Sequence, residues 1–278
     1  MLGLKRKKAS KRSVLVHFHI FKNGGTTFDF ALKREFKRKF AEFDGNRPRY
    51  SHLPNEIAAY LTANSHVEAL SSHHLRFPLP EVPELNLLPA LFVRHPLDRM
   101  HSIYRYERKQ RSSSPGSVNA KKSSFPDYVR WRLDQGQSNL LCDYHASILT
   151  CNPRAGSREI DAELARGRLR SSTICGVVDR LEESLALAEV RLSPFFPGLN
   201  LATTPQNVTS GRKASLQDRI NDAEKACGTE LFADVVARNT LDLELYQIAN
   251  NLLTERIQDL DAGSSRIASY RDRCNLLT

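Results

Sequence analysis

The stretch Val14-Leu15-Val16-His17-Phe18-His19-Ile20 is joined through Phe21 to Lys22-Asn23-Gly24-Gly25-Thr26-Thr27. β-Branched and aromatic residues dominate the first segment and predict a strand, whereas the glycine pair in the second predicts a turn. Beyond the turn, apolar residues recur at every fourth position, which predicts one face of a helix. They are Phe28, Leu32, Phe36 and Phe40. The segment therefore has the order strand, glycine turn, helix.

The glycine turn is a candidate phosphate site. A turn between a strand and a helix gathers backbone N–H groups at the positive end of the helix dipole. Lys22 adds a mobile cation, and Thr26 and Thr27 add hydroxyl donors. The alternative is a plain turn whose glycines serve only the backbone geometry. Because a lysine precedes the glycines and two threonines follow them, we expect a phosphate site. Its members are Lys22, Asn23, Gly24, Gly25, Thr26 and Thr27.

The position of the lysine distinguishes this turn from the loop of nucleotide triphosphatases. That loop reads G-x-x-x-x-G-K-[ST], with the lysine after the glycines and a hydroxyl for magnesium. Lys22 instead precedes Gly24-Gly25. The sequence therefore predicts phosphate chemistry of another type.

Further units of strand and helix follow along the chain. Ala90-Leu91-Phe92-Val93 predicts a buried strand that ends at Arg94, and Leu97 to Tyr104 predicts a helix. A second helix is expected from Phe125, and a third strand from Thr173 to Val178 with a helix after it. Residues 110–124 and 193–212 are rich in serine, proline and glycine and predict loops. Two helices are expected after the second loop, and the signal beyond Asp259 is weak.

Strands that alternate with helices predict a parallel sheet covered on both faces. We therefore expect an α/β fold with a single domain over residues 14–278. Residues 1–13 carry six positive side chains within the first twelve positions and predict a basic tail. The chain of 278 residues, 40% of them apolar, is long enough for a sizeable core.

Composition also limits the compartment and the partners. No apolar run reaches the length of a membrane span, and the basic start lacks the apolar stretch of a secretory signal, so we expect a cytoplasmic protein. The net charge of +10 suits an anionic partner. Five cysteines without a CxxC pair favour buried thiols. Whether Cys142 and Cys151 are bridged stays open, as does the oligomeric state.

Two segments resemble motifs of PAPS-dependent sulfotransferases, where PAPS is 3′-phosphoadenosine 5′-phosphosulfate. Residues 21–27 resemble the 5′-phosphosulfate loop, which the carbohydrate branch often writes P-K-x-G-x-T-[ST]; Lys22, Thr26 and Thr27 match, and Phe21 replaces proline. Residues 94–104 resemble the 3′-phosphate motif R-[DH]-P-x-x-R-x-x-S-x-Y. The resemblance implies the sulfotransferase fold, a P-loop-like parallel sheet flanked by helices. It also implies that Arg94 and Ser102 hold the 3′-phosphate.

Three weaker matches extend the resemblance over most of the chain. Residues 175–185 resemble a segment that carbohydrate enzymes often carry as G-x-x-E-R-x-x-E-S-L, and residues 239–246 resemble their penultimate helix. Residues 207–213 resemble a late loop near the nucleotide, which implies that Arg212 and Lys213 contact PAPS.

A base for the acceptor hydroxyl is expected between the two motifs. The 2-O-type polysaccharide sulfotransferases carry a histidine there, and this interval holds His73 and His74. An imidazole can accept a proton near neutral pH. The alternative is that these are surface or packing histidines. We do not expect a metal, because adjacent side chains diverge and no acidic or cysteine ligands accompany them.

The expected function is transfer of a sulfuryl group from PAPS to a hydroxyl, with a carbohydrate as the favoured acceptor. His73 or His74 takes the proton, and Lys22 stabilises charge on the bridging phosphate oxygen. Three arginines could contact an acidic acceptor: Arg76, Arg105 and Arg108. One alternative is a P-loop-type kinase or phosphatase, which needs magnesium. The other is a non-catalytic protein that binds nucleic acid or another anionic polymer. Nucleic acid is disfavoured because the aromatic residues lie on apolar helix faces.

Overall fold

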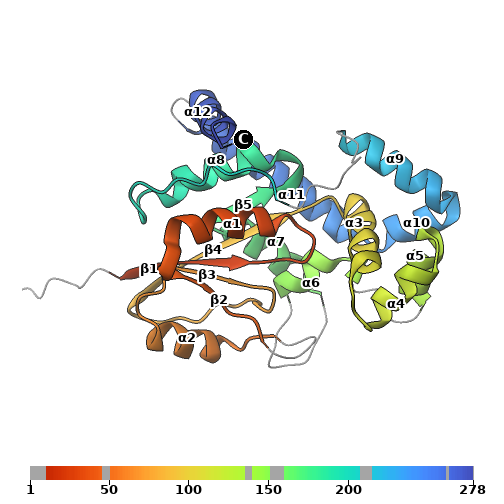
Figure 1. Ribbon diagram of the computed structural model, residues 1–278, viewed down its shortest axis with the longest axis horizontal. Helices are drawn as coiled ribbons and strands as arrows, with labels where there is room; N and C mark the ends of the chain where they lie inside the picture. The colour runs from red at the N-terminus through yellow and green to blue at the C-terminus, as the bar shows by residue number, and fades with distance from the viewer. Residues whose placement is uncertain are drawn as a thin grey trace, which may run out of the picture.

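Five parallel strands form the centre of the computed structural model, which describes residues 11–45, 51–134, 140–150, 160–206, 215–260 and 263–277 (Figure 1). The sheet has the order β2-β3-β1-β4-β5. Its strands are β1 (Arg12–Phe18), β2 (Phe40–Glu42), β3 (Ala69–Ser72), β4 (Leu85–Val93) and β5 (Ile174–Val177). β1 lies at the centre, with Val16 opposite Leu70 of β3 and Pro89 of β4. The α/β fold with a parallel sheet is thus confirmed.

Helices cover both faces of the sheet (Figure 1). The apolar cluster on one face includes residues of α1 (Gly25–Phe36), α8 (Leu181–Leu192) and α12 (Gly263–Asn275). The cluster on the other face includes residues of α2 (Pro54–Ala63), α6 (Tyr144–Thr150), α7 (Ala162–Ser171) and α11 (Thr240–Gln258). Because both faces are covered, both sets of alternating side chains in β1 are apolar and buried. Val14, Leu15, Val16 and Phe18 are at most 1% exposed.

A third apolar cluster lies beside the sheet, among helices at the right of Figure 1. It is built by α3 (Pro96–Lys109), α4 (Pro115–Lys122), α5 (Phe125–Asp134), α9 (Leu216–Cys227) and α10 (Thr229–Ala237). α3 leaves the carboxyl end of β4, so this helical group begins at the edge of the sheet where the glycine turn lies.

The structure corrects several expectations about local elements. α1 ends at Phe36 because Lys37 has φ 50°, so Phe40 belongs to strand β2 and not to the helix. Residues 115–122 form helix α4, which Ser114 caps through the N–H of Ser117, where a loop was expected. Pro115 occupies its first turn, where proline is tolerated. Three helices, not two, lie between residues 215 and 258, and α12 follows them.

Other boundaries agree or shift slightly. The expected helix from Phe125 and the strand near Thr173 are present as α5 and β5. β1 begins at Arg12, two residues before the expected domain boundary. The short strands β2 and β3 had no recognisable pattern in the sequence. Residues 193–206 contain no helix or strand, as expected for that part of the loop.

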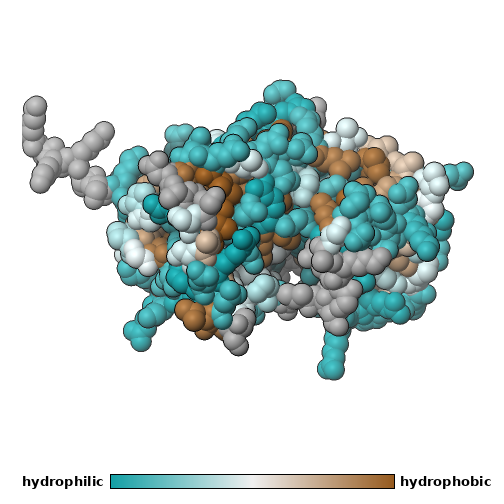
Figure 2. Space-filling view, turned by 90° about the horizontal axis from the view of Figure 1, so that it is seen from above, coloured by the Kyte–Doolittle hydropathy of each residue, from teal (hydrophilic) through white to brown (hydrophobic). Residues whose placement is uncertain are grey.

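The surface seen in Figure 2 is largely hydrophilic, with apolar residues in short bands. Within the described ranges, no helix has the length and hydropathy that crossing a membrane requires.

The close contact between β4 and β5 gives a test of packing. A Cβ built on Gly176 would lie 2.5 Å from Cε1 of Phe92, whereas a Cβ on Gly167 meets no atom within 4 Å. Gly176→Ala should therefore lower the free energy of unfolding by about 1–3 kcal/mol through overpacking. Gly167→Ala, inside helix α7, should raise it by up to about 1 kcal/mol.

Urea unfolding followed by circular dichroism measures both changes. Equal stability of the two variants would contradict the packing around Gly176.

Candidate active site

The glycine turn adopts a conformation that presents backbone amides. Lys22 and Gly24 both have positive φ values, 62° and 73°, and Gly24 is the N-cap of α1. The first amides of a helix have no acceptor within the helix. Alternation of left-handed and right-handed residues turns successive N–H groups toward one side and forms an anion-binding nest. Lys22 holds its conformation at a cost of about 1–2 kcal/mol, because its side chain disfavours positive φ.

Side chains from the end of β4 and from α3 donate hydrogen bonds to carbonyl groups of the turn. Nη1 of Arg94 donates to the carbonyl oxygen of Lys22 at 3.2 Å, and Nη1 of the buried Arg99 donates to that of Phe21 at 3.4 Å. The side-chain amide of Asn23 donates to the carbonyl oxygen of Phe92 in β4 at 2.7 Å. The two arginines thus hold carbonyl groups of the turn, and Asn23 ties its backbone to β4.

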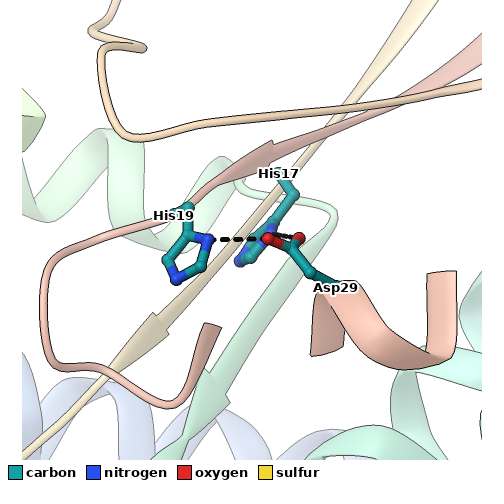
Figure 3. Close-up of side chains that lie close together, drawn as sticks. All are labelled: His17, His19 and Asp29. Carbon is teal, nitrogen blue, oxygen red and sulfur yellow. Dashed lines mark hydrogen bonds and ion pairs between the residues drawn. The ribbon is translucent and has the colours of Figure 1, made fainter. Parts of the chain in front are cut away.

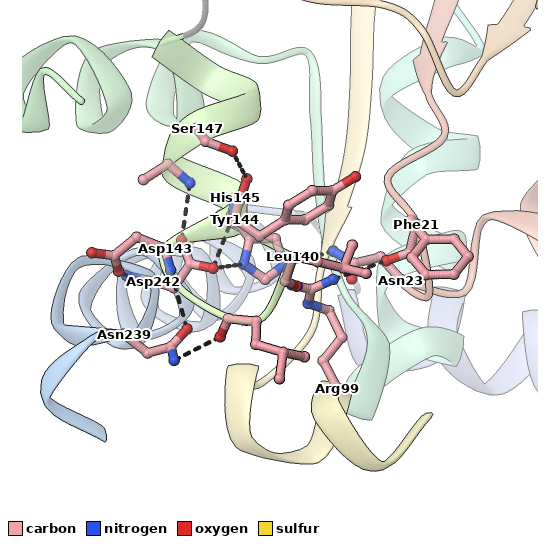
Figure 4. A network of polar contacts seen from close by, with 12 residues as sticks. Phe21, Asn23, Arg99, Leu140, Asp143, Tyr144, His145, Ser147, Asn239 and Asp242 are labelled. Atoms are coloured by element: carbon pink, nitrogen blue, oxygen red, sulfur yellow. Dashed lines mark hydrogen bonds and ion pairs between the residues drawn. The ribbon is translucent and has the colours of Figure 1, made fainter. Parts of the chain in front are cut away.

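Asn23 is in turn oriented by a buried pair on the far side of the sheet edge (Figure 4). Nε2 of His145 accepts from the Asn23 amide at 2.7 Å, and Nδ1 of His145 donates to Asp242 at 2.6 Å. Burial alone would raise the pKa of the Asp242 carboxyl, but His145 and two backbone N–H donors lower it. The ionised carboxylate therefore keeps the proton of His145 on Nδ1 and leaves Nε2 free to accept. Both helices that supply this pair, α6 and α11, pack against each other.

The Lys22 ammonium lies against an aromatic ring of α3. Nζ lies 4.6 Å from the ring centroid of Tyr106. Burial lowers the pKa of Lys22, and the positive charges of Arg94 and Lys109 lower it further. The lysine thus lies among other cations, an environment that favours an anion nearby.

The two threonines of the turn differ in their contacts. Thr26 is exposed, whereas Thr27 is buried and its hydroxyl oxygen accepts from the backbone N–H of Gln206 at 3.0 Å. This bond ties the turn to the chain that leads to residue 207. Arg212 and Lys213 lie outside the described residues, and so does Cys151.

The second motif places Arg94 at the carboxyl end of β4, next to the turn. Its side chain is largely buried, and Nε donates to Asp98 at 2.7 Å. With Nη1 bonded to Lys22, Nη2 is the nitrogen of Arg94 that has no acceptor among the described residues. Ser102, two turns along α3, is half-buried, and its hydroxyl has no hydrogen-bond partner in the same part of the chain. Nη2 of Arg94 and the hydroxyl group of Ser102 can therefore both form hydrogen bonds to a ligand.

Arg219, which no sequence pattern indicated, contacts the second motif through Asp98. Arg219 of α9 donates to Asp98 at 2.9 Å and also to Asp179, which accepts from the hydroxyl of Tyr246 at 3.2 Å. Arg219 belongs to a helix that packs on α3. Its contribution follows from tertiary packing, which no local pattern reveals.

The two candidate bases lie after β3, the strand next to β1. Nδ1 of His73 donates to the carbonyl oxygen of His19 at 2.7 Å, which leaves Nε2 as the acceptor nitrogen. Nδ1 of His74 instead accepts from the backbone N–H of Gly45 at 2.7 Å, so its proton is on Nε2. Asp44 fixes this turn by accepting from the backbone N–H of His73 at 2.8 Å. Burial lowers the pKa of His73, and His19 lowers it further, while Asp44 acts in the opposite direction.

A further cluster of histidines adjoins the turn (Figure 3). Asp29 of α1 accepts from Nδ1 of His17 at one oxygen and from Nδ1 of His19 at the other, each at 2.7 Å. Burial alone would raise the pKa of Asp29, but the two imidazoles hold it far below its usual range. The sequence offered one signal, because residues two apart on a strand face the same side. Their donor atoms lie within 4.8 Å of one another, a spacing that also occurs in metal sites.

The arginines expected to contact an acidic acceptor lie in two places. Nη1 of Arg76 donates to the carbonyl oxygens of His73 and Leu75, so Arg76 helps shape the histidine turn. Arg105 and Arg108 are exposed on α3. Nη1 of Arg108 donates to the hydroxyl oxygen of Tyr104 at 3.3 Å.

Comparison with known proteins identifies the family of the chain. A model of the sulfotransferase family matches residues 7–248. The chain belongs to the sulfotransferase family. An uncharacterized protein of Archaeoglobus fulgidus is 28% identical over 241 residues, which cover 85% of this chain and 95% of the relative. Membership supports sulfuryl transfer in general, and members of the sulfotransferase family generally use PAPS.

The buried pair behind Asn23 should contribute strongly to the stability of this sulfotransferase. Asp242→Asn replaces a carboxylate that accepts from Nδ1 and the N–H of His145 and from the N–H of Ala146. The loss should be about 3 kcal/mol of the free energy of unfolding, because buried donors lose a charged partner. Asp234→Asn, at an exposed pair with Arg238, should change it by less than about 1 kcal/mol.

Urea unfolding of both variants gives the comparison. A similar loss for both would show that the buried pair is no more important than a surface ion pair.

Proposed function

We propose that this sulfotransferase uses PAPS as the donor and transfers its sulfuryl group to a hydroxyl of a carbohydrate. The observation that carries the proposal is the convergence of three features at the carboxyl ends of adjacent strands. These are the amide nest after β1, Arg94 after β4, and the correctly oriented imidazole of His73 after β3. Ligands of parallel α/β sheets bind at such an edge, where the strand order reverses.

The residues present fit a donor with two phosphate groups. The nest and Lys22 suit the 5′-phosphosulfate, because they supply amides and a cation with a lowered pKa. Nη2 of Arg94 and the hydroxyl of Ser102 suit a 3′-phosphate, since neither has a protein partner in the described chain. Asn23 fixes the turn by donating a hydrogen bond to the carbonyl oxygen of Phe92 in β4. Arg212 and Lys213 remain proposed contacts on the strength of the motif alone.

The donor supplies a sulfuryl group attached to a phosphate leaving group. The acceptor oxygen forms a bond to sulfur, and the bond from sulfur to the phosphate oxygen breaks. Nε2 of His73 receives the proton of the acceptor hydroxyl, and Lys22 stabilises the charge on the departing oxygen. His73 is favoured over His74, because only its Nε2 carries a lone pair in the hydrogen-bonded arrangement.

The environment of the turn disfavours a magnesium-dependent kinase. Two carboxylates on the helices that adjoin the turn are already engaged: Asp29 by two imidazoles and Asp98 by two arginines. The carbohydrate acceptor rests on the resemblance of the motifs, and Arg105 and Arg108 suit one that carries negative charge. A non-catalytic polymer-binding role would not require Nε2 of His73 to be the acceptor nitrogen.

Ser102→Ala tests the 3′-phosphate site. It should weaken binding of PAP, the product nucleotide, about tenfold, since a hydrogen bond to a charged group contributes about 1.5 kcal/mol or more. Binding of AMP, which lacks the 3′-phosphate, should not change. Arg94→Ala should weaken both nucleotides, because Arg94 also holds the carbonyl oxygen of Lys22. Isothermal titration measures both ligands, with the exposed Ser171→Ala as the control.

Equal losses for PAP and AMP in Ser102→Ala would remove Ser102 from the 3′-phosphate site. Stabilisation by ATP with magnesium but not by PAP would contradict the proposed donor as a whole.

His73→Gln and His74→Gln distinguish the two histidines. His73→Gln should lower kcat by about 100-fold or more, whereas His74→Gln should lower it far less. PAP affinity should change little in either. Because the pKa of His73 is lowered, the base stays deprotonated to lower pH, and the acid limb of the kcat profile should lie below about pH 6.5.

Rates with labelled PAPS and a panel of sugars provide the measurement and identify the acceptor. If His74→Gln proves the more damaging change at saturating acceptor, the assignment of the base is wrong.

A further inference from the structure

A recess lies at the amino end of the sheet, away from the glycine turn. Its volume is about 950 Å³, which falls in the range of about 300–1,000 Å³ that ligand pockets have. Its lining comes mainly from the start of β1, the end of α1 with the 3₁₀ turn η1 (Lys37–Lys39), and the loop after α8. β1 begins at this recess, at the left of Figure 1, and spans seven residues, or about 23 Å, toward the glycine turn.

The lining of the recess carries an excess of positive charge. Five of its residues are basic and two are acidic, and both acidic residues already have partners. Glu35 accepts from Nε of Arg34 at 3.0 Å, and Glu68 accepts from Nζ of Lys39 at 2.7 Å. The other basic residues of the lining have no carboxylate partner in the described part of the chain: Lys11, Arg12, Lys37 and Arg38.

One of these charges is held in place by the fold. The side chain of Arg12 is half-buried and donates to the carbonyl oxygens of Leu61, at 2.7 Å, and of Val67. Because these oxygens belong to neutral peptide groups, the guanidinium keeps its full positive charge. Its position is fixed before any ligand arrives, so binding an anion beside it costs little additional side-chain entropy.

The backbone at the end of α1 presents further cations. Lys37 has φ 50° and ψ −117°, a region that glycine adopts at no steric cost and that a lysine side chain disfavours. The side chains of Lys37 and Arg38 are both exposed. The carboxyl end of α1 carries about half of a negative charge, which is less than either side chain would neutralise. Both cations therefore remain available to an anionic ligand.

An aromatic ring lies among these cations. Phe195 lines the recess and is 40% exposed, whereas the ring of the adjacent Phe196 is buried against Phe36 at the end of α1. The C–H groups on one face of a sugar ring are attracted to the negative face of an aromatic ring. Lysine and arginine form charge-assisted hydrogen bonds to sulfate and carboxylate groups. An acidic sugar chain offers both kinds of group.

Other anionic partners fit the recess less well. Proteins that lie on a membrane insert protruding apolar side chains between the lipids, whereas Phe195 lines a hollow. Proteins that bind single-stranded nucleic acid stack successive bases on several rings. Of the three phenylalanines in the lining, Phe36 and Phe196 are buried, which leaves one ring exposed.

We propose that this recess is a second binding site, separate from the active site, for an acidic glycan. Lys11, Lys37 and Arg38 bind its sulfate or carboxylate groups, and Phe195 stacks on one of its sugar rings. The choice of a glycan rests on the proposed function, in which the acceptor is a carbohydrate. A polymeric acceptor held here has an increased effective concentration of its remaining hydroxyl groups at the active site.

Fluorescence anisotropy with an end-labelled chondroitin sulfate chain tests the charged part of the recess. Lys37→Gly combined with Arg38→Ser should weaken binding about tenfold, because two charge-assisted contacts are lost. Glycine suits the backbone at position 37, so the fold should be retained. Lys121→Ser combined with Lys122→Ser is the matched control. It removes the same charge from exposed positions of α4, at the opposite end of the molecule in Figure 1, and should change binding by less than about twofold.

Phe195→Ala separates a glycan from other polyanions. It should weaken binding of chondroitin sulfate about fivefold through the lost stacking. Binding of inorganic polyphosphate, which carries charge but no sugar ring, should not change. PAP affinity should stay at the wild-type value in all of these variants, because the recess lies away from the glycine turn.

The inference is overturned if the wild type does not bind chondroitin sulfate, or if the recess and α4 variants lose equal affinity, since binding then follows overall charge. Equal losses for chondroitin sulfate and polyphosphate in Phe195→Ala would contradict the glycan. So would a larger loss for phosphatidylglycerol vesicles or single-stranded DNA. In each case, wild-type binding of PAP leaves the proposed donor intact. Failure to bind PAP, with glycan binding at the recess retained, would instead contradict the proposed function.

Discussion

The side-chain amide of Asn23 is the interaction on which the arrangement of the site depends. Its two hydrogens join the glycine turn to β4 through Phe92 and to α6 through His145. Asp242 on α11 then fixes which nitrogen of His145 accepts. A residue of the glycine turn is thus bonded to the sheet and to α6, and through His145 it is connected to α11. Arg94 and Arg99 hold two carbonyl groups of the turn as well, so its conformation depends on tertiary hydrogen bonds and not on its glycines alone.

A sequence could predict the parts of this molecule that depend on local chemistry. The run of apolar residues in β1, the glycine turn and the order of lysine and threonines all follow from short-range rules, and they led to the α/β fold and the position of the nest. The same holds for Arg94, which follows a strand directly. Short strands such as β2 and β3 escape such rules, because β2 is defined by its pairing with β3, and β3 by its pairing with β1, while their three or four residues carry no periodic signal.

The polar residues behind the site could not be found in this way. The buried face of α11 includes Asp242 beside Leu245 and Ala249, and an acidic residue does not contribute to an apolar pattern. A buried carboxylate is intelligible only once His145 stands beside it, and 97 residues separate the two. The choice between His73 and His74 also needed coordinates, since it depends on whether each Nδ1 donates or accepts. His17 and His19 stand two residues apart in the sequence, but their common partner Asp29 is evident only in the fold.

Gly25 and His19 share one small volume, and this restricts how the two positions can change during evolution. A side chain at position 25 would occupy the space of the imidazole, because its Cβ would lie within 2.6 Å of the ring. Alanine at position 25 therefore becomes acceptable only after a smaller residue replaces the histidine. The two positions should vary as a pair among descendants of this chain. A lineage that gives up the imidazole at position 19 would then be free to build its nest without a glycine there.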